Sequence, residues 1–79
     1  MINKTVTIPC DMTGRYVQHL VYKISQIPHD CYVRFDDRQV NAKSVLGILS
    51  LDLHEGDIVE FVVNSDEDVN TEDIFAEEM

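Results

Sequence analysis

The chain has 79 residues, which is enough for one small domain with a single hydrophobic core. Fifteen acidic and six basic residues give a formal net charge of -9, which argues against direct binding to nucleic acid because phosphate contacts need Lys and Arg. No apolar run approaches the roughly 18 residues of a membrane span, and the first residues do not resemble a signal peptide. We therefore expect one cytoplasmic domain over residues 1–79, with no direct contact to a membrane.

The first third of the chain predicts a strand followed by a helix. Residues 2–8 alternate apolar and polar side chains, which is typical of a half-exposed strand, and Pro9 ends it. Thr13 has the chemistry of a helix N-cap, and Pro28 is expected to stop the helix near Ile27. Between them, an apolar stripe at helical spacing is formed by Val17, Leu20, Val21 and Ile24.

The next segments predict a hairpin, a short helix and a buried strand. Residues 31–35 alternate again, and a turn at 36–37 leads to a short strand around 39–41. Ser44 then begins a short helix, and residues 58–63 read as a mostly buried strand. The short helix is denser in apolar residues than one buried stripe requires, with Val45, Leu46, Ile48, Leu49 and Leu51. Part of it is therefore expected to face solvent, and an exposed apolar patch implies a partner.

The C-terminal segment, residues 65–79, is strongly acidic. It contains seven Asp and Glu residues and neither Lys nor Arg, so that it carries -7 of the net charge of -9. Such a tail usually keeps a protein soluble, and docking to a basic partner is the alternative. Asn70 is able to cap a weak final helix, which like charges oppose. The full order of elements is then β-α-β-β-α-β-α, which predicts an α+β sandwich with helices over one face of a sheet.

The chemistry-bearing residues outside this pattern do not indicate an enzyme. Cys10 and Cys31 lack a metal-binding spacing and are expected to be reduced. The cysteines and histidines form no catalytic pair by spacing, and three glycines do not make a phosphate-binding loop. We therefore predict a binding and regulatory protein that is not an enzyme and uses neither a metal nor a cofactor.

Residues 39–51, reading QVNAKSVLGILSL, connect a predicted strand to a helix that begins at Ser44, with almost no loop between them. This segment resembles the regulatory-serine motif of the histidine-containing phosphocarrier proteins (HPr) of the bacterial sugar phosphotransferase system, and the resemblance covers roughly residues 4–64. It implies an open-faced sandwich with three helices on one face of a four-stranded antiparallel sheet, in which the first and last strands are adjacent. It also implies that Ser44 is a kinase target, whereas a simple helix cap is the structural alternative.

Residues 11–16, reading DMTGRY, align without a gap with the catalytic pattern Gly-apolar-His-Ala-Arg-Pro of the same family. Met12 and Arg15 match, whereas Thr13 stands where the family has its phosphorylated histidine. In this respect the chain is similar to the catabolite-repression HPr-like proteins, in which another residue occupies the histidine position. A threonine hydroxyl is a weak nucleophile without an adjacent base, so the resemblance implies a protein that does not carry phosphate in the usual way.

The resemblance further implies protein partners, namely an HPr serine kinase/phosphorylase, a catabolite-control repressor or other phosphotransferase-system proteins. The residues expected to contact them are Arg15, Val45, Leu46 and Leu49. Two alternatives stay open: an HPr-fold protein with neither phosphosite in use, and a phosphocarrier with a different acceptor such as His19. For His19, His29 and His54, a solvated or capping role is the simpler interpretation.

Overall fold

The computed structural model describes residues 1–66 of the chain. The elements follow in the order β1 (Ile2–Thr7), α1 (Gly14–Ile24), β2 (Cys31–Phe35), β3 (Arg38–Asn41), α2 (Val45–Leu49) and β4 (Ile58–Val63). This confirms the predicted order from the first strand to the fourth. The final helix predicted around Asn70 lies outside the described residues. Within residues 1–66, no helix is both long enough and apolar enough to cross a bilayer.

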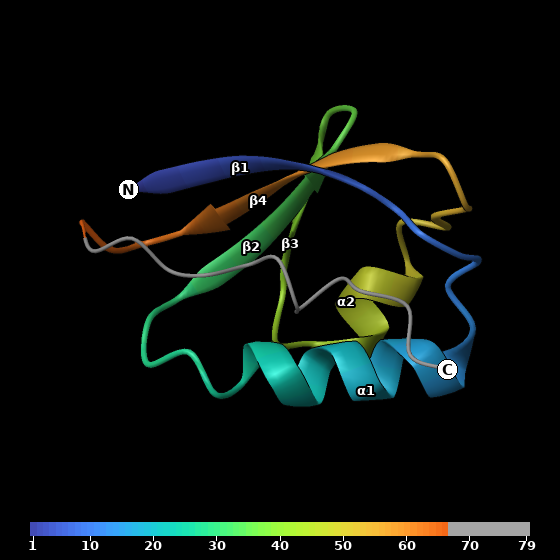
Figure 1. The fold of residues 1–79 in the computed structure, drawn as a ribbon, viewed down its shortest axis with the longest axis horizontal. Helices are drawn as coiled ribbons and strands as arrows, with labels where there is room; N and C mark the ends of the chain where they lie inside the picture. Colours follow the sequence, from blue (N-terminus) through green and yellow to red (C-terminus); the bar gives the residue numbers. More distant parts are fainter. Residues whose placement is uncertain (67–79) are drawn as a thin grey trace.

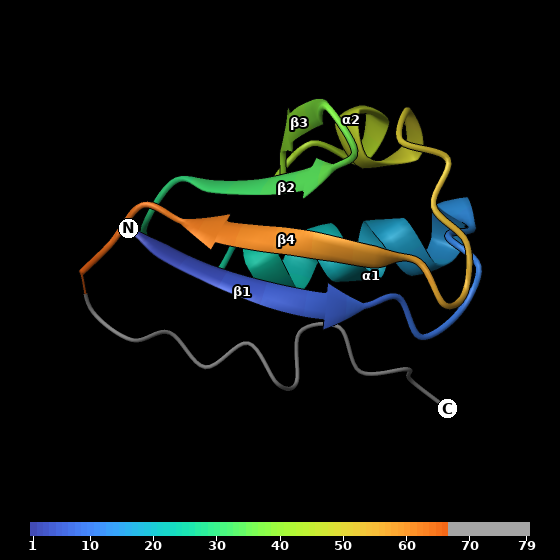
Figure 2. The same cartoon turned by 90° about the horizontal axis from the view of Figure 1, so that it is seen from above.

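The four strands form one antiparallel sheet in the order β1-β4-β2-β3. Strands β1 and β4 pair along their whole length, from Ile2 opposite Val63 to Thr7 opposite Ile58. The first and last strands are therefore neighbours, as the family resemblance implied. Figure 2 shows the strands side by side, with α2 next to β3 at one border of the sheet.

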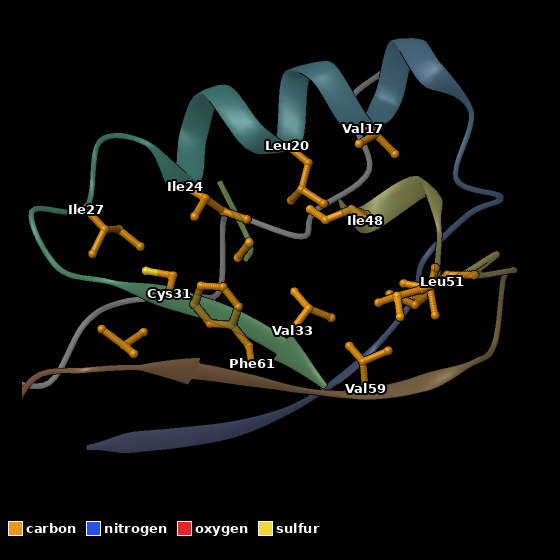
Figure 3. Close-up of a cluster of buried hydrophobic side chains, with 14 residues drawn as sticks. Val17, Leu20, Ile24, Ile27, Cys31, Val33, Ile48, Leu51, Val59 and Phe61 are labelled. Atoms are coloured by element: carbon orange, nitrogen blue, oxygen red, sulfur yellow. The ribbon is translucent and has the colours of Figure 1, made fainter. Parts of the chain in front are cut away.

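The two helices of residues 1–66 lie on the same face of the sheet, which confirms the open-faced α+β class (Figure 1). Figure 3 shows the core between these layers, where Val17, Leu20 and Ile24 of α1 point toward the sheet. Phe61 of β4 and Val33 of β2 face them, and both are almost completely buried. Burying the apolar stripe of α1 against this face supplies much of the hydrophobic stabilisation of so small a fold.

Helix α1 ends at Ile24, three residues earlier than expected. Ser25 is its C-cap, and the backbone N–H of Ile27 bonds to the carbonyl of Ile24 at 3.0 Å, an i to i+3 contact that tightens the last turn. Val21, predicted to share the buried stripe, is only partly buried. It therefore lies at the border of the apolar face, while Val17, Leu20 and Ile24 form its centre.

Two strand boundaries differ slightly from the sequence prediction. Strand β1 ends at Thr7, but Ile8 remains buried, and its backbone bonds to the loop before β4 through Asp57 at 2.8 Å and Gly56 at 2.9 Å.

Strand β3 begins at Arg38 rather than Gln39. The preceding turn places Asp36 in the left-handed region with a φ of 55°, a conformation that Asp tolerates better than most residues.

Candidate functional site

Ser44 is the N-cap of α2, as its place in the sequence predicts. Its backbone is extended, with φ -111° and ψ 116°, and its Oγ accepts a hydrogen bond from the backbone N–H of Gly47 at 3.1 Å. Its carbonyl accepts from Ile48 at 3.1 Å, and its own N–H donates to the carbonyl of Asn41 at 3.0 Å. The half-buried serine is therefore fixed through both backbone and side chain.

The three residues before Ser44 are also held in place. The side-chain Oδ1 of Asn41 accepts from the N–H of Lys43 at 2.9 Å, which closes an Asx turn. Ala42 is fully buried, and its N–H donates to the carbonyl of Cys31 at 2.9 Å. The Lys43 ammonium reaches across to the carbonyl of Ile27 at 2.8 Å. The approach to Ser44 is thus tied to β2 and to the turn after α1.

The other end of α2 is held by an arginine from β3. Arg38 donates from Nη1 to the carbonyl of Ser50 at 2.7 Å and from Nη2 to the Ser50 Oγ at 3.2 Å. Ser50 is the C-cap of α2, and its hydroxyl donates to the carbonyl of Gly47 at 2.6 Å. Arg38 therefore satisfies orphan acceptors at the end where a cation is electrostatically favourable.

Helix α2 presents two of its three predicted contact residues to solvent. Leu46 is 79% exposed and Leu49 is 36% exposed, whereas Ile48 on the opposite side is 1% exposed. Val45 is partly buried and packs against the hydrophobic core. The predicted apolar patch on this helix therefore consists mainly of Leu46 and Leu49, which we call the α2 patch.

Thr13 and Arg15 lie at the start of α1, which packs beside α2 (Figure 1). Thr13 is the N-cap, with φ -74° and ψ 158°, and its Oγ1 accepts from the N–H of Tyr16 at 3.3 Å. Both Thr13 and Arg15 are exposed. None of the described carboxylates forms an ion pair with the Arg15 guanidinium, so this group is able to face a partner.

The three histidines are spread over different parts of the fold. His19 is exposed on α1, and the carbonyl of His29 accepts a contact from the Cys31 Sγ at 3.4 Å. The ring of His54 has Nδ1 3.9 Å from the Asp11 Oδ1 and Nε2 3.6 Å from the Asp52 Oδ1. Residues 1–66 contain no group of three or more His, Cys, Asp or Glu side chains arranged to hold a metal ion.

Neither Cys10 nor Cys31 is part of a disulfide. Burial raises the pKa of the Cys31 thiol above 9.0; the nearby Lys43 ammonium opposes this change and the Asp30 carboxylate adds to it. A thiol that stays protonated is a poor nucleophile. Cys31 is therefore a core residue, in keeping with its 1% exposure.

Sequence reasoning did not single out Arg38, Asn41 or Gly47, although all three surround Ser44 or its helix. Asn41 and Gly47 left a local signal, because an Asn three residues before a Ser and a Gly three residues after it fit an Asx turn followed by a capped helix. The contact from Arg38 to Ser50 joins residues twelve positions apart. It depends on how α2 packs beside β3, and no local pattern reveals it.

Comparison with known proteins identifies a family over most of the chain. Residues 2–76 match the family model described as PTS HPr component phosphorylation site. No curated protein sequence matches the chain. The structure of HPr-C-His from Thermoanaerobacter tengcongensis is similar, with a TM-score of 0.76 and 29% identity, covering 84% of this chain and 76% of that chain.

Two further solved structures share the fold. The phosphocarrier protein HPr from Bacillus anthracis str. Ames has a TM-score of 0.76 and 24% identity, covering 82% of this chain and 80% of that chain. The Bacillus subtilis catabolite repression containing protein Crh has a TM-score of 0.65 and 24% identity, covering 84% of this chain and 78% of that chain. Crh is described as an intertwined dimer with a swapping domain.

Proposed function

Because the chain belongs to the HPr family of the phosphotransferase system, we propose that it is a regulatory member which does not use the family's phosphohistidine and is controlled by phosphorylation of Ser44. Members of this family are phosphocarrier proteins rather than enzymes, and they act with other proteins of the system. The observation that carries the proposal is Thr13, which occupies the place that the family motif gives to histidine.

The chemistry of Thr13 supports the first half of this proposal. The family carries its phosphoryl group on an imidazole nitrogen, which threonine lacks. The threonine hydroxyl needs an activating base before it can act as a nucleophile. The Thr13 Oγ1 already accepts the N–H of Tyr16 and caps α1. In this proposal, Thr13 keeps the local structure of the site without its transfer chemistry.

The surroundings of Ser44 support the second half. A phosphate there adds roughly -1.5 to -2 charges beside the α2 patch, where Leu46 is 79% exposed. Because Asn41, Lys43 and Arg38 hold both ends of the segment, the added charge need not unfold it. The modification therefore acts on binding to a partner more than on the fold.

The proposed contact surface combines Arg15 with Val45 and the α2 patch. A planar guanidinium is suited to bidentate recognition of phosphate or carboxylate groups, and the leucines supply apolar contact. The proposed partners are an HPr serine kinase/phosphorylase, which modifies Ser44, and a catabolite-control repressor, which reads the modified protein. Val45 contributes less than Leu46 because it packs partly against the core.

The proposal is tested with an HPr serine kinase and a site-mapped phosphorylation assay. We expect one phosphate on wild type, located at Ser44, and none on Ser44→Ala. Thr13→Ala is the matched control because it removes a hydroxyl cap from the other helix, and it should be modified like wild type. Modification elsewhere, or full modification of Ser44→Ala, would contradict the assignment.

The histidine-directed pathway is tested separately. Incubation with phosphoenolpyruvate and the first enzyme of the system, followed by intact mass, should show no acid-labile phosphate on wild type. We expect Thr13→His alone to restore transfer poorly, because Gly14 and Tyr16 also depart from the family motif. A phosphate on wild type that His19→Gln abolishes would favour the alternative of a carrier with a different acceptor, since His19 is exposed on α1.

A further inference from the structure

Gly47 occupies the middle of α2, where glycine is a poor choice for helix formation. Of the three glycines, all within residues 1–66, Gly56 is the one with a positive φ, at 91°. The backbone of Gly47 is therefore accessible to any L-residue. Its conformation does not explain why a glycine stands here.

The space around Gly47 offers an explanation. A Cβ atom at this position would lie 3.3 Å from the Ser44 Oγ, 3.3 Å from the Ser44 Cβ and 3.4 Å from the Asn41 carbonyl oxygen. The first two distances are tighter than ordinary van der Waals contact. At Gly14, in the first turn of α1, a Cβ would meet nothing within 4 Å. Of these two helical glycines, Gly47 is thus the one whose missing side chain leaves room beside a hydroxyl.

We propose that Gly47 is a positioning residue for the phosphorylation of Ser44, because the absence of a side chain there keeps the space beside the hydroxyl open to the phosphoryl donor. The inference rests on the proposed function of Ser44. In the transfer step, the Ser44 Oγ forms a bond to the terminal phosphorus of a nucleoside triphosphate. The bond from that phosphorus to the nucleoside diphosphate breaks, and the hydroxyl proton passes to a base of the kinase.

Steric room matters more for this step than for the cap itself. The cap needs only the hydrogen bond of 3.1 Å from the Gly47 N–H to the Ser44 Oγ, which an alanine at 47 also donates. The product instead places a phosphorus and three further oxygens where the hydroxyl held one hydrogen. Reacting atoms must also align at about 3 to 3.5 Å before the bond forms. A methyl group 3.3 Å from the Oγ competes for that space.

The test compares Gly47→Ala with Gly14→Ala under the same serine kinase. For Gly47→Ala we expect kcat to fall about tenfold or more, while KM changes by less than about twofold because Leu46 and Leu49 are unchanged. Gly14→Ala should keep both constants, and both variants should melt no lower than wild type. Equal kcat for Gly47→Ala and wild type would overturn the proposal. So would a loss of kcat matched by a lower melting temperature, since that indicates a structural role.

A second measurement does not depend on the kinase. Ser44→Cys places a thiol at the same position, and its alkylation by iodoacetamide reports the space beside it, with Cys10 and Cys31 replaced by Ala in every variant. We expect alkylation to be slower when Gly47→Ala is added and unchanged when Gly14→Ala is added. Equal rates in all three backgrounds would overturn the steric argument. If wild type is not phosphorylated while alkylation follows this pattern, the proposed function of Ser44 fails and the steric observation alone survives.

Discussion

The two helices begin in the same way but are held in place by different means. Each starts at a hydroxyl residue that accepts a backbone N–H three residues ahead, Thr13 in α1 and Ser44 in α2. Helix α1 has eleven residues and three fully buried side chains, whereas α2 has five residues and buries Ile48. A short helix gains little from propagation. Helix α1 therefore depends on packing, and α2 depends on the contacts at its two ends.

The hydroxyl groups of Thr13 and Ser44 also differ in how closely the surrounding residues enclose them. Thr13 is exposed and is followed by Gly14, which has open space around it. Ser44 is half-buried, and its N–H is bonded to Asn41 while Gly47 passes close to its Oγ. A change at Thr13 is therefore a local event at one end of a well-packed helix. A change at Ser44 acts on a short helix that is held by hydrogen bonds at its two ends.

The largest expected effect tests whether packing holds α1. Leu20→Ala should lower the free energy of unfolding by about 2 to 5 kcal/mol, because it removes buried methyl groups and leaves a cavity between α1 and the sheet. Leu46→Ala is the control on α2, and it should change stability by less than about 0.5 kcal/mol because Leu46 is exposed. Urea unfolding measures both. Similar losses for the two variants would contradict the contrast between the helices.

The two caps provide the next comparison. Ser44→Ala should cost about 1 to 2 kcal/mol, toward the upper end for an N-cap, because α2 has only five residues and buries only Ile48. Thr13→Ala should cost about 0.5 kcal/mol, because the buried face of α1 persists without the cap. Thermal and urea unfolding of the two variants give the difference. If Thr13→Ala is the more destabilised of the two, α1 depends on its cap more than its packing suggests.

Much of this contrast was predictable from local patterns. The alternation in residues 2–8 and 31–35 and the stripe of Val17, Leu20 and Ile24 predicted the first three elements, and the patterns in residues 36–63 predicted the next three. Thr13 and Ser44 were identified as caps because side-chain chemistry decides that role within one turn. The pairing of β1 with β4 joins the two ends of the described chain. It came from the family resemblance, since no local periodicity encodes a partner strand.

The surroundings of Ser44 were less predictable. Arg38 reaches Ser50, and Lys43 reaches the carbonyl of Ile27, sixteen positions away in the sequence. Such contacts depend on the conformations that long side chains adopt after the helices have packed. The degree of exposure within α2 was also hidden, because Val45 and Leu46 are both apolar neighbours and only the fold decides which one meets solvent.

The C-terminal contact of α2 gives a smaller expected effect. Arg38→Ala removes two hydrogen bonds to Ser50 and should lower the free energy of unfolding by about 1 kcal/mol, since bonds to a charged donor are strong but this side chain is exposed. Arg38→Lys keeps the charge without the two-pronged geometry and should recover part of the loss. Hydrogen exchange in residues 45–50 locates the effect. Unchanged exchange there in Arg38→Ala would show that α2 does not need this contact.

The smallest expected effect appears only at alkaline pH and concerns the buried Cys31. Its carbonyl accepts a hydrogen bond from the N–H of Ala42, in the segment that leads to Ser44. Burial raises the pKa of its thiol above 9.0, so the folded state retains the proton that the unfolded state loses. This contribution to stability is complete below pH 9.0 and is lost as the pH rises through the pKa of the folded state. Cys31→Ala lacks the titrating thiol, and the stability that it loses through poorer packing does not change with pH. The stability difference between wild type and Cys31→Ala should therefore narrow above pH 9.0, as followed by urea unfolding from pH 7 to 11. Comparing the two proteins cancels the titration of lysines and tyrosines common to both, so parallel curves would mean that the thiol is not protected by burial.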